Sequence, residues 1–160
     1  MDIRQRLHLS GMDSHAPELA RKWGLGLEVT DFCYAPMLDA PATFPAVREK
    51  MAGIDHFWLH APFAELAPCA VDPLVREVTA RRYRQALSAA RQLGIRRLVI
   101  HSGYIPLVYF PEWFTEQSVA FWREFLPEVP EDMVLALENV MDETPQLMTD
   151  IVRQVDDPRL

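Results

Sequence analysis

The sequence predicts an α/β protein built on a parallel sheet, a partial (β/α) barrel with about five of the eight β/α units. Short apolar runs alternate along the chain with longer segments of helical period, which is typical of βαβ units. The 160 residues, divided among five units, give 32 per unit, close to the roughly 31 of an eightfold barrel. No linker or change of composition divides the chain, so we expect residues 1–160 to form one partial barrel domain.

Five segments have the apolar character of parallel strands. They are Arg6–Ser10, Leu25–Val29, His56–His60, Arg97–His101 and Met133–Glu138. Parallel strands in such proteins are covered on both faces, and their side chains alternate between the two faces.

Helix signals lie between these strands. Asp72 is a favourable N-cap before Pro73, and an apolar period continues to Gly94, where the helix ends. The same kind of evidence predicts a helix after Thr144 and Pro145 and an aromatic-faced helix that packs on the sheet. The full set of predicted helices is 17–23, 45–52, 73–93, 114–125 and 145–155.

Composition excludes several classes of function. The net charge of −7 provides no field that would attract a polyanion, so we do not expect nucleic acid as a partner. No apolar run approaches the roughly 20 residues of a membrane span, and the N-terminus lacks a signal peptide's apolar core. We therefore expect a cytoplasmic protein without a membrane partner.

Polar residues of metal-binding or acid–base type stand where four of the strands end. They are Glu28, His60, His101 and Glu138. Because function gathers at the C-terminal ends of parallel strands, these side chains are candidates for one site. Two imidazoles and a carboxylate that meet at a barrel mouth would suit Zn²⁺, Mn²⁺ or a similar divalent ion. The alternative is that each is a hydrogen-bonded structural residue or a loop cap.

Three short strings occur in a suggestive order: Leu59-His-Ala-Pro-Phe63, His101-Ser-Gly-Tyr104 and Leu137-Glu-Asn-Val140. With them, the chain resembles the sugar phosphate isomerase/epimerase family, the xylose isomerase-like TIM barrels that share a superfamily with endonuclease IV. The resemblance implies a divalent metal, usually Mn²⁺, Zn²⁺, Mg²⁺ or Co²⁺, at the C-terminal mouth. By position, His60, His101 and Glu138 match the family's metal ligands, and Glu138 matches a residue that also moves a proton.

The activity that the resemblance implies is proton transfer next to a carbonyl of a sugar or sugar phosphate, with the metal as Lewis acid. His60, His101 and Glu28 would also contact the substrate. Two alternatives remain open. One is an endonuclease IV-like zinc phosphodiesterase that acts on abasic nucleic acid, and the other is a non-catalytic barrel fragment.

The chain departs from the family pattern because it stops before the later strands that carry further metal ligands. We therefore expect weak metal binding and little or no turnover from this polypeptide alone. An unclosed sheet has open edge strands and an exposed inner face. We accordingly expect the chain to self-associate, or to be a fragment of a longer gene product.

Overall fold

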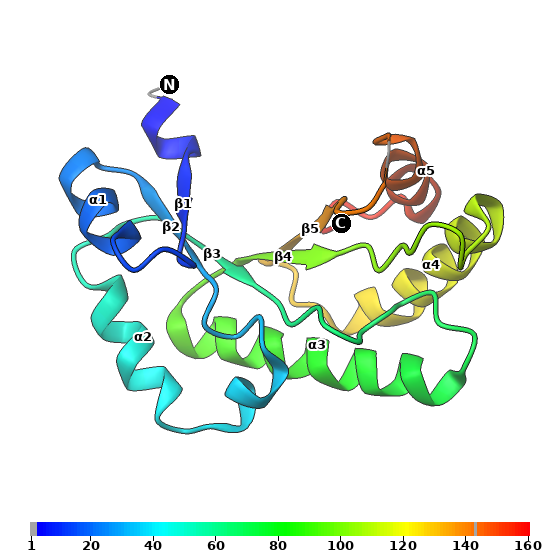
Figure 1. The fold of residues 1–160 in the computed structure, drawn as a ribbon, viewed down its shortest axis with the longest axis horizontal. Helices are drawn as coiled ribbons and strands as arrows, with labels where there is room; N and C mark the ends of the chain where they lie inside the picture. Colours follow the sequence, from blue (N-terminus) through cyan, green and yellow to red (C-terminus); the bar gives the residue numbers. More distant parts are fainter. Residues whose placement is uncertain (1–2, 143) are drawn as a thin grey trace.

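The computed structural model describes residues 3–142 and 144–160, and its centre is a five-stranded parallel sheet (Figure 1). The strands are β1 (His8–Ser10), β2 (Gly26–Val29), β3 (Phe57–His60), β4 (Arg97–His101) and β5 (Val134–Glu138). They lie in sequence order, and each pairs in parallel with the next. The predicted α/β class and the parallel sheet are confirmed.

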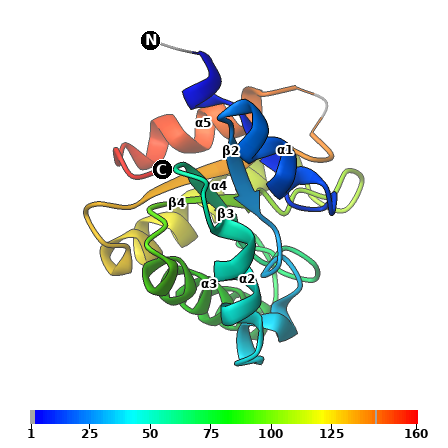
Figure 2. The ribbon, with the colours of Figure 1, turned by 90° about the vertical axis from the view of Figure 1, so that its left-hand side faces the viewer.

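Five helices connect or follow the strands. They are α1 (Ala16–Trp23), α2 (Thr43–Met51), α3 (Pro73–Leu93), α4 (Pro111–Phe125) and α5 (Gln146–Val155), with 3₁₀ segments at Ile3–Arg6, Ala35–Asp39 and Leu126–Glu128. In both views α2 and α3 lie on the same side of the sheet (Figures 1 and 2), and α1 and α5 lie toward opposite ends of the sheet (Figure 1). Among the described residues, none of the helices combines the length and hydropathy that crossing a bilayer requires.

Element boundaries differ from the predicted ones at several helix starts and at four strands, of which β2, β3 and β5 begin one residue later than predicted. The first strand begins at His8 rather than Arg6, because His8 is the first residue that pairs with β2, opposite Gly26. α1, α2 and α4 begin one to three residues before the predicted positions. The reason is that proline fits within the first helical turn, where an amide N–H has no intrahelical partner.

The longest helix, α3, has the ends that the sequence predicts. The Asp72 side chain accepts a hydrogen bond from the Leu74 amide at 2.8 Å, which satisfies one of the unpaired donors of the first turn. Gly94 ends the helix with φ of 73°, a left-handed conformation that glycine adopts without steric cost.

The two faces of the sheet differ in chemistry. The face toward the helices is apolar and almost fully buried, and its residues include Leu27, Leu59, Leu98, Ile100 and Leu135. The helical layer supplies stacked aromatic rings, with Tyr83 and Trp122 centroids 6.0 Å apart. Because side chains alternate along a strand, the residues between these leucines point to the opposite face. That inner face carries the polar residues considered next.

Candidate metal centre

Three of the predicted site residues end three consecutive strands. His60 is the last residue of β3, His101 the last of β4 and Glu138 the last of β5. The parallel register pairs His101 with Glu138 and His60 with Val99, so all three side chains leave the same face of the sheet. The sheet therefore brings together residues that are far apart in the sequence.

The three side chains form a close cluster of potential ligand atoms. The Nε2 atoms of His60 and His101 lie 3.1 Å apart, and Glu138 Oε2 lies 3.4 Å from each of them. His60 is buried, whereas nearly half of the Glu138 side chain is exposed. One side of the cluster is thus open to a ligand.

The backbone fixes which nitrogen of His60 points into the cluster. Its Nδ1 lies 2.8 Å from the Ala61 carbonyl oxygen, which can only accept, so Nδ1 donates this hydrogen bond. In the neutral ring, Nε2 then has a free lone pair directed toward His101 and Glu138. Histidine ligands of metals are commonly oriented in this way by a carbonyl that holds the other nitrogen.

Burial and neighbouring charges shift the pKa values of two groups on this face, His101 of the cluster and Glu28 of β2. Burial, together with the nearby His60, lowers the pKa of His101 below its usual value, and this effect exceeds the opposing influence of Glu138. Burial raises the pKa of Glu28, with a smaller raising effect from Glu138 and a lowering effect from His60. Glu28 is therefore within electrostatic range of the cluster.

The donor separations fit a single divalent ion. Donor atoms bound tetrahedrally to zinc at about 2.0–2.1 Å lie about 3.2–3.4 Å from one another. The observed separations of 3.1 and 3.4 Å are close to these values. Two imidazoles and a carboxylate also match the ligand preference of Zn²⁺, Mn²⁺ and Co²⁺ better than that of Mg²⁺, which prefers oxygen.

Sequence reasoning missed an aromatic residue at the cluster. The Phe63 ring stacks on His101 with centroids 4.2 Å apart and 19° between the planes, and it meets His60 edge-on at 5.4 Å. Phe63 lies in the string Leu59-His-Ala-Pro-Phe63, which was the available signal. Its contact with two imidazoles depends on the path of the loop after β3, which periodicity does not predict.

Glu28 stands apart from the other predicted site residues. It lies in the middle of β2, beside Trp58, on the same face as the cluster but not within it. A second unforeseen contact joins the loops after β4 and β5, where the Ser102 hydroxyl donates to Asp142 at 3.2 Å. This hydrogen bond connects the loops that follow His101 and Glu138.

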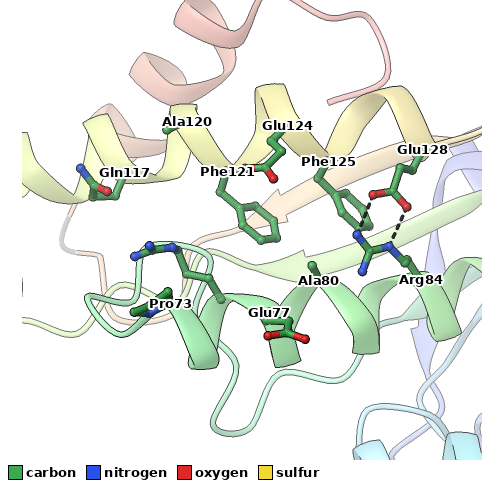
Figure 3. Close-up of a pocket in the computed structure, with 11 residues that line it drawn as sticks. Pro73, Glu77, Ala80, Arg84, Gln117, Ala120, Phe121, Glu124, Phe125 and Glu128 are labelled. Carbon is green, nitrogen blue, oxygen red and sulfur yellow. Dashed lines mark hydrogen bonds and ion pairs between the residues drawn. The ribbon is translucent and has the colours of Figure 1, made fainter.

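A surface groove lies away from the cluster, in the helical layer. A groove of about 440 Å³ runs between α3 and α4, with Phe121 and Phe125 on its floor (Figure 3). Arg84 closes one end by donating two hydrogen bonds to Glu128, at 2.6 and 2.7 Å (Figure 3). None of the cluster residues lines this groove, so the two features are separate.

The chain is similar to known proteins in both sequence and structure. Residues 20–160 match the family model described as a xylose isomerase-like TIM barrel. The chain belongs to this family. The resemblance inferred from the three strings is thereby confirmed, and the parallel sheet in sequence order is consistent with part of such a barrel.

Individual relatives of this xylose isomerase-like chain are longer than it is. An uncharacterized protein of Methanocaldococcus jannaschii is 30% identical over 112 residues, which cover 64% of this chain and 38% of the relative. A D-tagatose 3-epimerase-like structure has a TM-score of 0.75 at 22% identity, over 96% of this chain and 62% of that one. A structure of a Thermus thermophilus protein soaked with ZnCl₂ has a TM-score of 0.65 at 28% identity, over 94% and 62%.

Proposed function

We propose that this chain carries the metal-binding part of a metal-dependent sugar isomerase or epimerase centre, in which His60, His101 and Glu138 hold one divalent cation. The observation that supports this most directly is their convergence, with nitrogen and oxygen donors 3.1–3.4 Å apart. The Ala61 carbonyl orients His60 for coordination before any ligand arrives.

The chemistry follows from the donor set and its surroundings. A divalent cation bound here supplies Lewis-acid polarisation of a substrate carbonyl oxygen. Glu138 turns Oε2 toward the imidazoles, which leaves Oε1 to remove a proton from the carbon next to that carbonyl and return it on the same face to the neighbouring carbon, while a hydroxyl proton moves between the two oxygens. Return of a proton to the opposite face, as in an epimerase, would require a second acid on that face. His60 and His101 would position the substrate oxygens through the cation that they bind, and Glu28 would contact substrate hydroxyl groups from β2.

The solved relatives limit how much activity we assign to this chain. The chain spans 62% of the epimerase-like structure that it matches, so the activity of a whole protein of that length is part of the proposal. We expect weak metal binding and, at most, slow turnover from the 160-residue chain. The D-tagatose 3-epimerase-like relative supports a small sugar as the substrate.

Metal titration tests the centre itself. Titration of the chain with Zn²⁺ in a calorimeter, together with elemental analysis, is expected to give about one bound ion per chain. Glu138→Gln should weaken binding at least tenfold, because the amide loses the charge that attracts the cation. The control is Glu77→Gln on the exposed surface of α3, which should bind as the unmodified chain does. Absence of a stoichiometric ion, or equal affinity in Glu138→Gln, would refute the centre.

A solvent-exchange experiment tests the reaction. The Zn²⁺- or Mn²⁺-loaded chain in D₂O should introduce deuterium next to the carbonyl of D-fructose or D-tagatose, as followed by proton NMR, and Glu138→Gln should abolish this exchange. If the loaded chain instead cleaves a duplex at an abasic site, and His60→Ala removes the cleavage, the phosphodiesterase alternative replaces the isomerase proposal.

A further inference from the structure

Exposed apolar side chains are concentrated around the candidate centre. We call the described residues of the five segments that follow the strands the rim: residues 11–15, 30–42, 61–72, 102–110, 139–142 and 144–145. In a parallel sheet these segments all lie at the edge where the cluster is located. Of the 18 exposed large hydrophobic side chains among the described residues, 11 belong to the rim. Such a concentration beside a polar cluster marks a binding surface.

The loop after β4 contributes most to this surface. Leu107, Val108 and Phe110 are exposed to 105%, 62% and 81%. Leu107 also has a φ of 66°, a left-handed conformation that branched residues avoid. Phe63 extends the apolar surface inward, because its ring stacks on His101 and is itself 37% exposed.

The rim has no Lys or Arg that could receive a phosphate, and its histidine, His15, contacts the Asp13 carboxylate through Nδ1 at 3.1 Å. The rim's described residues include no Lys or Arg but six Asp or Glu residues. Three cations outside these segments contact them: Lys50 pairs with Asp31, Arg82 pairs with Asp39, and Arg76 donates hydrogen bonds to the Ala70 and Val71 carbonyls. Phosphate groups are usually bound by Arg, Lys or free helix N-termini, and the rim supplies no side chain of the first two kinds.

The N-termini of α3 and α4 are poorly suited to an anion, whereas those of α2 and α5 have neither a capping side chain nor an acid in the first turn. The Asp72 carboxylate already occupies the N-terminus of α3. Glu112 places a negative charge in the first turn of α4. Both acids would repel a phosphate at the positions where a helix dipole would otherwise attract it.

From these observations we propose that the ligand of this centre is uncharged and carries an apolar part. This inference rests on the function proposed above. The hydroxyl and carbonyl oxygens of the ligand reach the His60, His101 and Glu138 cluster, and its apolar substituent lies on Phe63 and the 102–110 segment. A phosphorylated sugar is disfavoured, because its dianion would enter a rim that has Asp and Glu side chains but no Lys or Arg.

Three matched probes test this substrate class: phenyl β-D-glucopyranoside, methyl β-D-glucopyranoside and D-glucose 6-phosphate. Saturation-transfer NMR on the full chain, with and without one equivalent of Zn²⁺, gives their relative affinities. The phenyl probe should bind about tenfold more tightly than the methyl probe. Burial of only part of the phenyl ring is enough to give this difference in affinity. Glucose 6-phosphate should bind most weakly of the three.

Two variants locate the binding surface. The double substitution Leu107→Ser with Phe110→Ser should remove most of the phenyl preference. The control is Trp23→Ser, which deletes a ring that is 56% exposed at the end of α1, outside the rim, and should leave the preference unchanged.

The possible outcomes separate this inference from the proposed function. If Zn²⁺ does not bind but the phenyl preference persists in the metal-free chain and is lost in the double variant, the proposed function fails and the rim preference stands. Binding of glucose 6-phosphate as tight as that of the phenyl probe would overturn the inference. So would a double variant that keeps the preference while light scattering shows a lower oligomeric state, because the rim would then be an interface between copies.

Discussion

Substitution of Phe63 tests whether the stacked ring orients His101. Phe63 is 37% exposed, so about two-thirds of a phenylalanine surface of about 200 Å² is buried, or about 130 Å². At about 25 cal/mol per Å², Phe63→Ala should lower the free energy of unfolding by up to about 3 kcal/mol. An aromatic pair contributes about 0.5–1.5 kcal/mol beyond burial, so the Zn²⁺ dissociation constant should rise about two- to twelvefold.

Two further substitutions at the same position separate orientation from burial. Phe63→Tyr keeps the ring and should bind Zn²⁺ as the unmodified chain does. Phe63→Leu keeps much of the apolar surface without a planar ring, so it should recover most of the stability but not the affinity. Urea unfolding and calorimetric titration measure the two quantities.

The control for this series is Phe44→Ala. Phe44 lies in α2 and contacts Phe32 with ring centroids 5.1 Å apart, and the two rings are remote in sequence from the cluster residues. Its removal should reduce stability and leave the Zn²⁺ affinity unchanged. If Phe63→Leu binds Zn²⁺ as tightly as the unmodified chain, the stacked ring does not orient His101 and the reasoning fails.

Three other predictions concern pH, association and backbone packing. The pKa of His101 is lower in the folded chain than in the unfolded chain, so around and below about pH 6.5 the unfolded chain binds more protons. The contribution of His101 to stability should therefore fall as the pH drops through about 6.5. Urea titrations at several pH values check this, and a His101→Asn variant should lack the effect. Val134 is 42% exposed on the edge strand β5, so we expect the chain to self-associate. Light scattering should show this association and its reduction in Val134→Lys. A monomer at all concentrations would contradict the prediction. Gly26→Ala should destabilise the fold by about 1–3 kcal/mol in urea unfolding, because a Cβ there would lie 2.2 Å from the His8 ring, and an unchanged midpoint would show that the ring moves aside at little cost.

The sheet and the cluster could be predicted because both depend on simple periodicity. Leu98 and Ile100 alternate with Val99 and His101, and this pattern predicts both the buried face and the direction of the histidine. Since parallel strands end at a common edge, polar residues at strand ends predict a shared site without any knowledge of loops.

The remaining features could not be predicted because they depend on the paths of the loops. The ring of Phe63 reaches His101 across 38 residues of sequence, and no local pattern indicates such a contact. The same holds for the hydrogen bond from Ser102 to Asp142 and for the 3₁₀ segment Ala35–Asp39. Glu28 had the right residue type at a strand, but it lies one position before the end of β2 and outside the cluster.

The pairing of β4 with β5 has a consequence for folding. His101 lies opposite Glu138, and a shift of one residue along β5 would turn every side chain of that strand to the other face. The shifted strand would place a carboxylate among the leucines of the helical layer, where an unpaired charge is costly. Misaligned assembly is therefore penalised by the same residue that completes the ligand set, and the chemistry of the site helps the polypeptide choose its native alignment.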